Sequence, residues 1–129
     1  DALLAPHRCY LAEVEALQAA GLAIKGMAHI TGGGFVENVP RCLPPHLAAR
    51  LVAKSWDIPP LFQQLIKWSA ISREETYRIF NLGLGMVLVL AAEDAAPALD
   101  LLPDAAVVGR LIARSGDEAA IQIIFGEKP

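Results

Sequence analysis

The chain is poor in cysteine, carries little net charge and has no long apolar run, and each lack excludes a class of protein. Its 129 residues include two cysteines, Cys9 and Cys42, which form neither a zinc-binding spacing nor a disulfide framework. This favours a reducing compartment, so we expect a cytoplasmic protein. The formal net charge is −3, and the 11 lysines and arginines are scattered. We therefore expect neither a nucleic-acid partner nor a polybasic membrane patch.

The longest apolar run covers residues 82–92 and ends at Glu93. A membrane-spanning helix needs about 20 such residues, so this run predicts a buried strand and no membrane association. No signal peptide opens the sequence, and the first residue is Asp1 rather than methionine. We therefore expect the chain to be a fragment of a longer protein.

Hydrophobic residues make up 54% of the chain and charged residues 19%, which is typical of one packed globular domain. Helical and strand patterns alternate, so we expect an α/β or α+β layered domain without internal repeats. Helices are predicted at residues 10–20, 35–43, 61–68, 73–80 and 93–102, and strands at 21–30, 51–55, 84–91, 107–113 and 119–125. A turn at residues 115–117 is predicted to join the last two strands.

Two local features add detail to this plan. Ser72 and Glu75 have the spacing of a capping box, which predicts that Ser72 caps the fourth helix. Trp56, Phe62 and Trp68 lie near one predicted helix, and we expect them to belong to the core rather than to stack on a ligand.

The strongest local signal is the glycine triplet, Gly32, Gly33 and Gly34, between a predicted strand and a predicted helix. Glycines adopt backbone angles closed to other residues and leave no side chain in a ligand's way. At a helix start, free amides and the helix dipole favour an anion such as phosphate. The alternative is a tight turn where backbone packs against backbone, and the residues alone leave both open. The pattern is neither a P-loop nor a dinucleotide fingerprint.

His29 and Thr31 precede the triplet. His29 suits a phosphate contact, a proton donor or a core position, and the core position is the simpler interpretation. Thr31 suits an anion contact or a turn cap, of which the cap is simpler.

A second signal covers residues 77–86, where a helix is predicted to end at Asn81 and a strand to follow through two spaced glycines. Asn81 suits a ligand contact, but a role in ending the helix is enough to explain an asparagine here. Arg78 suits a bidentate phosphate contact, or a solvated charge at the C-terminus of a helix.

The acidic residues indicate no reaction by themselves. Glu37, Glu74 and Glu75 fall in predicted first turns of helices, where a carboxylate is stabilising without a catalytic role. No aspartate cluster predicts a Mg²⁺ site, and no Ser/His/Asp or Cys/His set stands out. The residues alone predict an anion-binding domain without a complete active site.

Residues 24–44 and 77–86 together resemble the C-terminal domain of the aminoimidazole ribonucleotide synthetases, also called phosphoribosylformylglycinamidine cyclo-ligases. Residues 3–10 resemble the first segment of the same domain, so the resemblance covers nearly the whole chain. The Thr-Gly-Gly-Gly turn is shared with selenophosphate synthetase and thiamine-monophosphate kinase. The Asn-Val-Pro-Arg continuation and the block at residues 77–86 resemble the cyclo-ligases much more specifically. His7, Cys9 and Ile79 stand where the family usually has threonine, isoleucine and threonine.

The resemblance implies an α+β fold, a layered sandwich with a mixed sheet, over residues 1–129. It implies a ligase of purine biosynthesis that uses ATP and Mg²⁺ to close the imidazole ring of formylglycinamidine ribonucleotide. The N-terminal domain of the same enzyme would hold most of the ATP and metal site. The full-length enzyme would be a homodimer, and the fragment alone would be inactive.

The resemblance also assigns roles to residues of this chain. His29 is the candidate catalytic residue, and no metal ligand is expected. The candidate ligands of substrate or phosphate are Thr31, Gly32, Gly33 and Gly34, with Asn81 and Arg78 as weaker candidates. Two alternatives stay open: another ATP-dependent enzyme of the superfamily, selenophosphate synthetase-like or thiamine-monophosphate kinase-like, or a non-catalytic phosphate-binding module.

Overall fold

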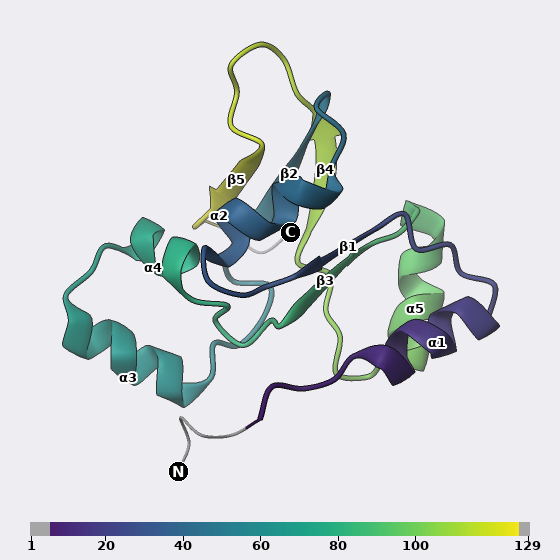
Figure 1. Cartoon of the computed structure of the whole chain (residues 1–129), viewed down its shortest axis with the longest axis horizontal. Helices are drawn as coiled ribbons and strands as arrows, with labels where there is room; N and C mark the ends of the chain where they lie inside the picture. The colour runs from purple at the N-terminus through teal and green to yellow at the C-terminus, as the bar shows by residue number, and fades with distance from the viewer. Residues whose placement is uncertain (1–5, 127–129) are drawn as a thin grey trace.

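A computed structural model describes residues 6–126 (Figure 1). This part of the chain forms five α-helices and five strands, which confirms the α+β class. The α-helices are α1 (Leu11–Ala19), α2 (Gly34–Asn38), α3 (Pro60–Ser69), α4 (Arg73–Ile79) and α5 (Ala95–Leu101). The strands are β1 (Gly26–His29), β2 (Leu47–Val52), β3 (Met86–Val89), β4 (Gly109–Ala113) and β5 (Ile121–Ile124). Among residues 6–126, the 3₁₀ helix η2 (Val39–Cys42) continues α2, and the 3₁₀ helix η3 (Ala92–Asp94) precedes α5.

The strands form two sheets. β1 pairs with β3 in an antiparallel ribbon in which Ala28 faces Val87. The other sheet has the order β4-β2-β5, with β2 antiparallel to β4 and parallel to β5, so it is mixed as predicted. Because β2 lies between β4 and β5, the turn at residues 115–117 does not form a hairpin. It joins two strands that flank a third.

The two sheets and the helices around them enclose one core. In Figure 1, α3 and α4 lie beyond one end of the β1/β3 ribbon, and α1 and α5 lie together beyond the other end. The ring of Tyr77 contacts the rings of Phe35, Trp56 and Phe125 at centroid distances of 5.9, 6.1 and 5.4 Å. These four aromatic residues join α2, α4, the segment after β2 and the end of β5. The core therefore packs both sequence motifs against the mixed sheet.

Several predicted boundaries shift. The Ser72 hydroxyl accepts a hydrogen bond from the Glu75 amide at 3.1 Å, which confirms the predicted cap. α4 ends at Ile79 and not at Asn81, because Phe80 is already extended. The left-handed residues of this turn are Leu82 and Gly83, with φ of 49° and 96°.

Strand β2 begins earlier than the predicted residues 51–55. It starts at Leu47, soon after the Pro44-Pro45 pair, and ends at Val52. Beyond it the chain turns, and both the amide and the hydroxyl of Ser55 donate to the Val52 carbonyl. The strand is therefore bounded by a proline break and a hydroxyl-stabilised turn.

The aromatic residues near α3 do not all join the core. The Trp56 indole packs there and donates to the Leu82 carbonyl at 3.1 Å, and Phe62 packs on Phe80. Trp68 is 74% exposed, so its assignment to the core was wrong. The reason is that α3 lies at the edge of the domain and buries no residue completely. Within residues 6–126, no helix combines the length and apolar character that a membrane crossing requires.

Candidate functional site

Strand pairing brings the two motif segments together. The β1/β3 register places Gly26 opposite Val89 and His29 opposite Met86. Just beyond the strands, the Ile30 amide donates to the Gly85 carbonyl at 2.9 Å. The glycine triplet and the block around residues 77–86 therefore belong to one structural unit.

The triplet forms a tight turn into α2. The Gly34 amide donates to the Thr31 carbonyl at 3.0 Å, which closes the turn. Gly33 and Gly34 have φ of 91° and 54°, in the left-handed region that other residues rarely adopt. Their backbone angles alone favour glycine at both positions.

The three glycines differ in their surroundings. A β-carbon on Gly34 would overlap the Tyr77 carbonyl of α4, and one on Gly33 would overlap the Glu37 side chain. Gly34 is buried, so this position requires glycine because the backbone of α4 packs directly against it. Gly32 is exposed, and nothing lies within 4 Å of where its β-carbon would be. The side of the turn at Gly32 therefore leaves room for a ligand.

Asn38 holds the turn in place, a role that sequence reasoning missed. Its buried carboxamide donates to the carbonyls of Thr31, Gly32 and Gly34 at 3.4, 3.2 and 2.8 Å. The carboxamide oxygen accepts from the Thr31 hydroxyl at 3.4 Å and from Arg41 at 3.2 Å. The signal available in the sequence was an asparagine four residues after the last glycine, on the first turns of the following helix.

The amides of Gly32 and Gly33 have no backbone acceptor among residues 6–126. Two such donors at a helix start suit an anionic oxygen. The Glu37 side chain folds back to Gly33, where its carboxylate lies beside the turn. An anion bound at Gly33 would have to displace the Glu37 carboxylate, whereas no atom lies close to the β-carbon position of Gly32.

His29 ends β1 and is exposed, so it does not occupy the core position that the residues alone favoured. Its Nε2 lies 2.7 Å from the Nε2 of His7, and the two ring centroids are 4.7 Å apart. Thr31 is exposed, and its hydroxyl donates to the Asn38 carboxamide oxygen at 3.4 Å, so it does not cap α2 as the simpler interpretation predicted. His29 and Thr31 thus reach the surface beside the turn.

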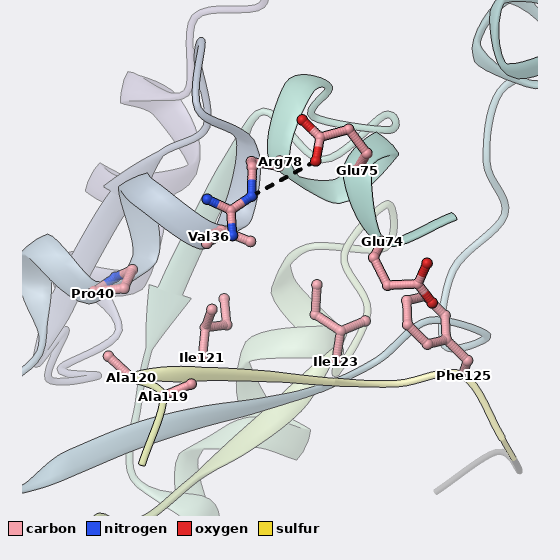
Figure 2. A pocket seen from close by; sticks show the side chains of 10 residues that line it. All are labelled: Val36, Pro40, Glu74, Glu75, Arg78, Ala119, Ala120, Ile121, Ile123 and Phe125. Atoms are coloured by element: carbon pink, nitrogen blue, oxygen red, sulfur yellow. Dashed lines mark ion pairs between the residues drawn. The ribbon is translucent and has the colours of Figure 1, made fainter. Parts of the chain in front are cut away.

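Arg78 and Asn81 are placed differently. Arg78 lines a hollow of about 390 Å³ between α2, α4 and β5, with its Nε 4.0 Å from a Glu75 carboxylate oxygen (Figure 2). The lining of this hollow does not include residues 29–34. The Asn81 carboxamide oxygen accepts from the Gly83 amide at 3.1 Å and stabilises the turn after α4. The structure therefore groups His29 with residues 31–34 and sets Arg78 apart.

Burial makes two potential nucleophiles of the described core, Cys42 and Tyr77, harder to deprotonate. Burial raises the pKa of the Cys42 thiol, which remains protonated at neutral pH. Burial also raises the pKa of the Tyr77 hydroxyl, an effect that Arg73 partly opposes. Within residues 6–126, no three histidine, cysteine, aspartate or glutamate side chains come together in a group able to hold a metal ion. The amides of Gly32 and Gly33 therefore remain the groups of this turn best suited to bind an anion.

A salt bridge anchors the segment before α1. Arg8 pairs with Glu13 in α1 and lies 3.4 Å from Asp104. A backbone hydrogen bond and the contact with Arg8 lower the pKa of Glu13, and the same contact raises the pKa of Arg8. Both groups stay charged at neutral pH, so the pair persists there.

Comparison with known proteins adds independent information. A sequence profile of the family described as AIR synthase related protein, C-terminal domain, matches residues 1–122. A phosphoribosylformylglycinamidine cyclo-ligase of a Synechococcus species is 46% identical over 121 residues, which are 94% of this chain and 34% of that protein. The cyclo-ligase of Neisseria meningitidis is 46% identical over 127 residues, 95% of this chain and 37% of that protein. That of Myxococcus xanthus is 44% identical over 125 residues, 94% of this chain and 36% of that protein. The chain thus spans about a third of the length of these relatives.

Proposed function

Because the chain belongs to the family of AIR synthase related proteins, as their C-terminal domain, we propose that it is part of a phosphoribosylformylglycinamidine cyclo-ligase. The observation that carries this proposal is 44–46% identity over nearly the whole chain to proteins of that name. Their greater length supports a second domain, N-terminal to this one, as its partner in the complete enzyme.

The proposed reaction closes an imidazole ring. ATP phosphorylates the formamide oxygen of formylglycinamidine ribonucleotide, and ADP is released. A ring-forming nitrogen then attacks the activated carbon, and the oxygen leaves as phosphate to give aminoimidazole ribonucleotide. Such chemistry depends on positioning and on stabilising charge at phosphoryl oxygens.

The glycine turn supplies groups of the kind that this reaction needs. In the proposal, the amides of Gly32 and Gly33 bind phosphate oxygens of substrate or nucleotide, since both donors are free of backbone acceptors in the described chain. The Thr31 hydroxyl lies at the same exposed turn, and Asn38 fixes the turn before a ligand arrives. His29, at the end of β1, donates a hydrogen bond or a proton to the bound group.

ATP and Mg²⁺ require other residues. Mg²⁺ prefers oxygen ligands in octahedral geometry, and residues 6–126 offer no cluster of carboxylates for it. The described part of the chain therefore does not fit a Mg²⁺ site by itself, and we assign metal and most nucleotide contacts to the N-terminal domain. A homodimeric, cytoplasmic full-length enzyme belongs to the same proposal.

The proposal is tested by assaying the natural protein that contains this chain. We expect ADP and aminoimidazole ribonucleotide to form from formylglycinamidine ribonucleotide and ATP. We expect no product from selenide or thiamine monophosphate, the substrates of the rival superfamily enzymes. The 129-residue chain assayed alone is expected to be inactive. Turnover of a rival substrate instead, or product from the chain alone, would contradict the proposal.

His29 is tested in the same assay by His29→Gln, which keeps a polar side chain of similar size. If His29 transfers a proton to the reacting group, kcat falls by about a hundredfold to ten-thousandfold while the fold is unchanged. His46→Gln is the matched control, because His46 is exposed on the loop before β2, away from the glycine turn in sequence. Equal turnover and substrate affinity in the wild type and His29→Gln would remove His29 from the site.

A further inference from the structure

Two histidines meet at the surface beside the glycine turn. The Nε2 atoms of His7 and His29 are 2.7 Å apart, and the ring planes are inclined by 61°. Both residues are exposed, so solvent and ions reach the pair. In this contact one Nε2 donates and the other accepts, which requires a lone pair on at least one ring. The proposed reaction makes no use of His7.

The two rings differ in how firmly they are held. His29 is the last residue of β1, where pairing with Met86 of β3 fixes its backbone. His7 lies in the irregular segment before α1, and its ring also contacts the edge of the Tyr10 ring at a centroid distance of 6.0 Å. Strand pairing thus holds the backbone of His29, whereas His7 lies outside any helix or strand, one residue before the Arg8–Glu13 salt bridge.

We infer that His7 and His29 form a two-imidazole binding site for a divalent transition-metal ion of the Zn²⁺ or Cu²⁺ type. Imidazole nitrogen is a preferred ligand of these ions. Zn–N bonds of about 2.0–2.1 Å in tetrahedral geometry place two ligand nitrogens about 3.3 Å apart. The present separation of 2.7 Å has to open by about 0.6 Å for this geometry, which is less than one bond length. Water would complete the coordination.

Local charge permits a cation at this position. The nearest cation in sequence to His7 is Arg8, which is paired with Glu13 and Asp104. The pair of nitrogens also sets the site apart from a Mg²⁺ site, because Mg²⁺ selects oxygen ligands. The bound ion would link the segment before α1 to the end of β1, next to the glycine turn.

The inference is tested without nucleotide or substrate, so its outcome is independent of the proposed ligase activity. Zn²⁺ is titrated into the chain at neutral pH by calorimetry, while NMR follows the imidazole signals of the three histidines. We expect one ion per chain, with shifts at His7 and His29 and none at His46. Mg²⁺ in place of Zn²⁺ is expected to give no shifts.

Variants complete the test. Removing a residue that hydrogen-bonds to a metal ligand typically weakens metal binding by about tenfold to a hundredfold. Removing the ligand itself weakens binding at least as much, so we expect a loss of Zn²⁺ affinity of that size or larger in His7→Thr and in His29→Gln. Threonine at position 7 is the residue usual in the resembled family, so the fold is expected to tolerate it. His46→Gln and Cys9→Ser are expected to bind as the wild type does. Unchanged affinity in His7→Thr, or loss of binding in Cys9→Ser or His46→Gln, would overturn the inference.

Discussion

Replacing Gly34 by alanine is expected to lower the free energy of unfolding of this chain by about 2–5 kcal/mol. Two costs add. Alanine in the left-handed region, at the φ of 54° found here, is strained, and its β-carbon would overlap the Tyr77 carbonyl. That carbonyl belongs to the α4 backbone, which cannot move without disturbing the core.

Gly32→Ala is the matched control two residues earlier. Position 32 is exposed, its φ is not in the left-handed region, and a β-carbon there meets no atom within 4 Å. We expect the free energy of unfolding to change by less than about 0.5 kcal/mol. Urea denaturation followed by circular dichroism measures both variants. Equal stability of Gly34→Ala and the wild type would show that α2 and α4 do not pack as closely as the structure indicates.

The second large effect is expected from Asn38→Asp, which replaces the side-chain NH2 group by an oxygen. Asn38 is 4% exposed, and its side chain donates hydrogen bonds to three carbonyls of the glycine turn. An aspartate carboxylate would keep the contact with Arg41 through one oxygen, but its other oxygen would face those three carbonyl oxygens and could donate to none of them. Leaving a buried acceptor without its donor costs about 1–3 kcal/mol, and we expect a loss of at least that size at neutral pH. Faster hydrogen exchange at the amides of residues 32–34 would report the loosened turn.

Asn81→Asp is the matched control for this substitution. The Asn81 side chain accepts a hydrogen bond from the Gly83 amide, and a carboxylate accepts that bond equally well. We expect its stability to stay within about 0.5 kcal/mol of the wild type. The loss in Asn38→Asp should also shrink at low pH, because the folded state favours the protonated carboxyl, which donates one hydrogen bond. A loss that is equal at neutral and low pH would show that repulsion is not its cause.

Local spacing was enough to predict several features. The Ser72 cap depends on residues three apart in one turn of helix, so neighbouring residues decide it. A layered domain of α/β or α+β class follows from helical and strand patterns, which depend on each segment's own residues, and the resemblance selected α+β. Trp68 was assigned wrongly because its apolar character says nothing about where α3 lies relative to the rest of the domain.

Pairing across the chain could not be predicted in the same way. The short turn at residues 115–117 indicates that two strands follow each other, but not that β2 inserts between them. Strand order is set by which apolar faces bury together, and β2 comes from a part of the chain distant from β4 and β5. The folded sheet is what places β5 opposite Arg78 across the hollow in Figure 2.

The sequence by itself determined the position of the glycine turn, the residues around it and the resemblance that points to a purine-biosynthetic ligase. These depend on the order of neighbouring residues, which a sequence displays directly. Only the tertiary structure decided that Gly34 serves packing, that Gly32 stays open and that His29 meets His7 across 22 residues. Those contacts arise when β1 pairs with β3 and α2 packs on α4, because only then do distant residues come within bonding distance.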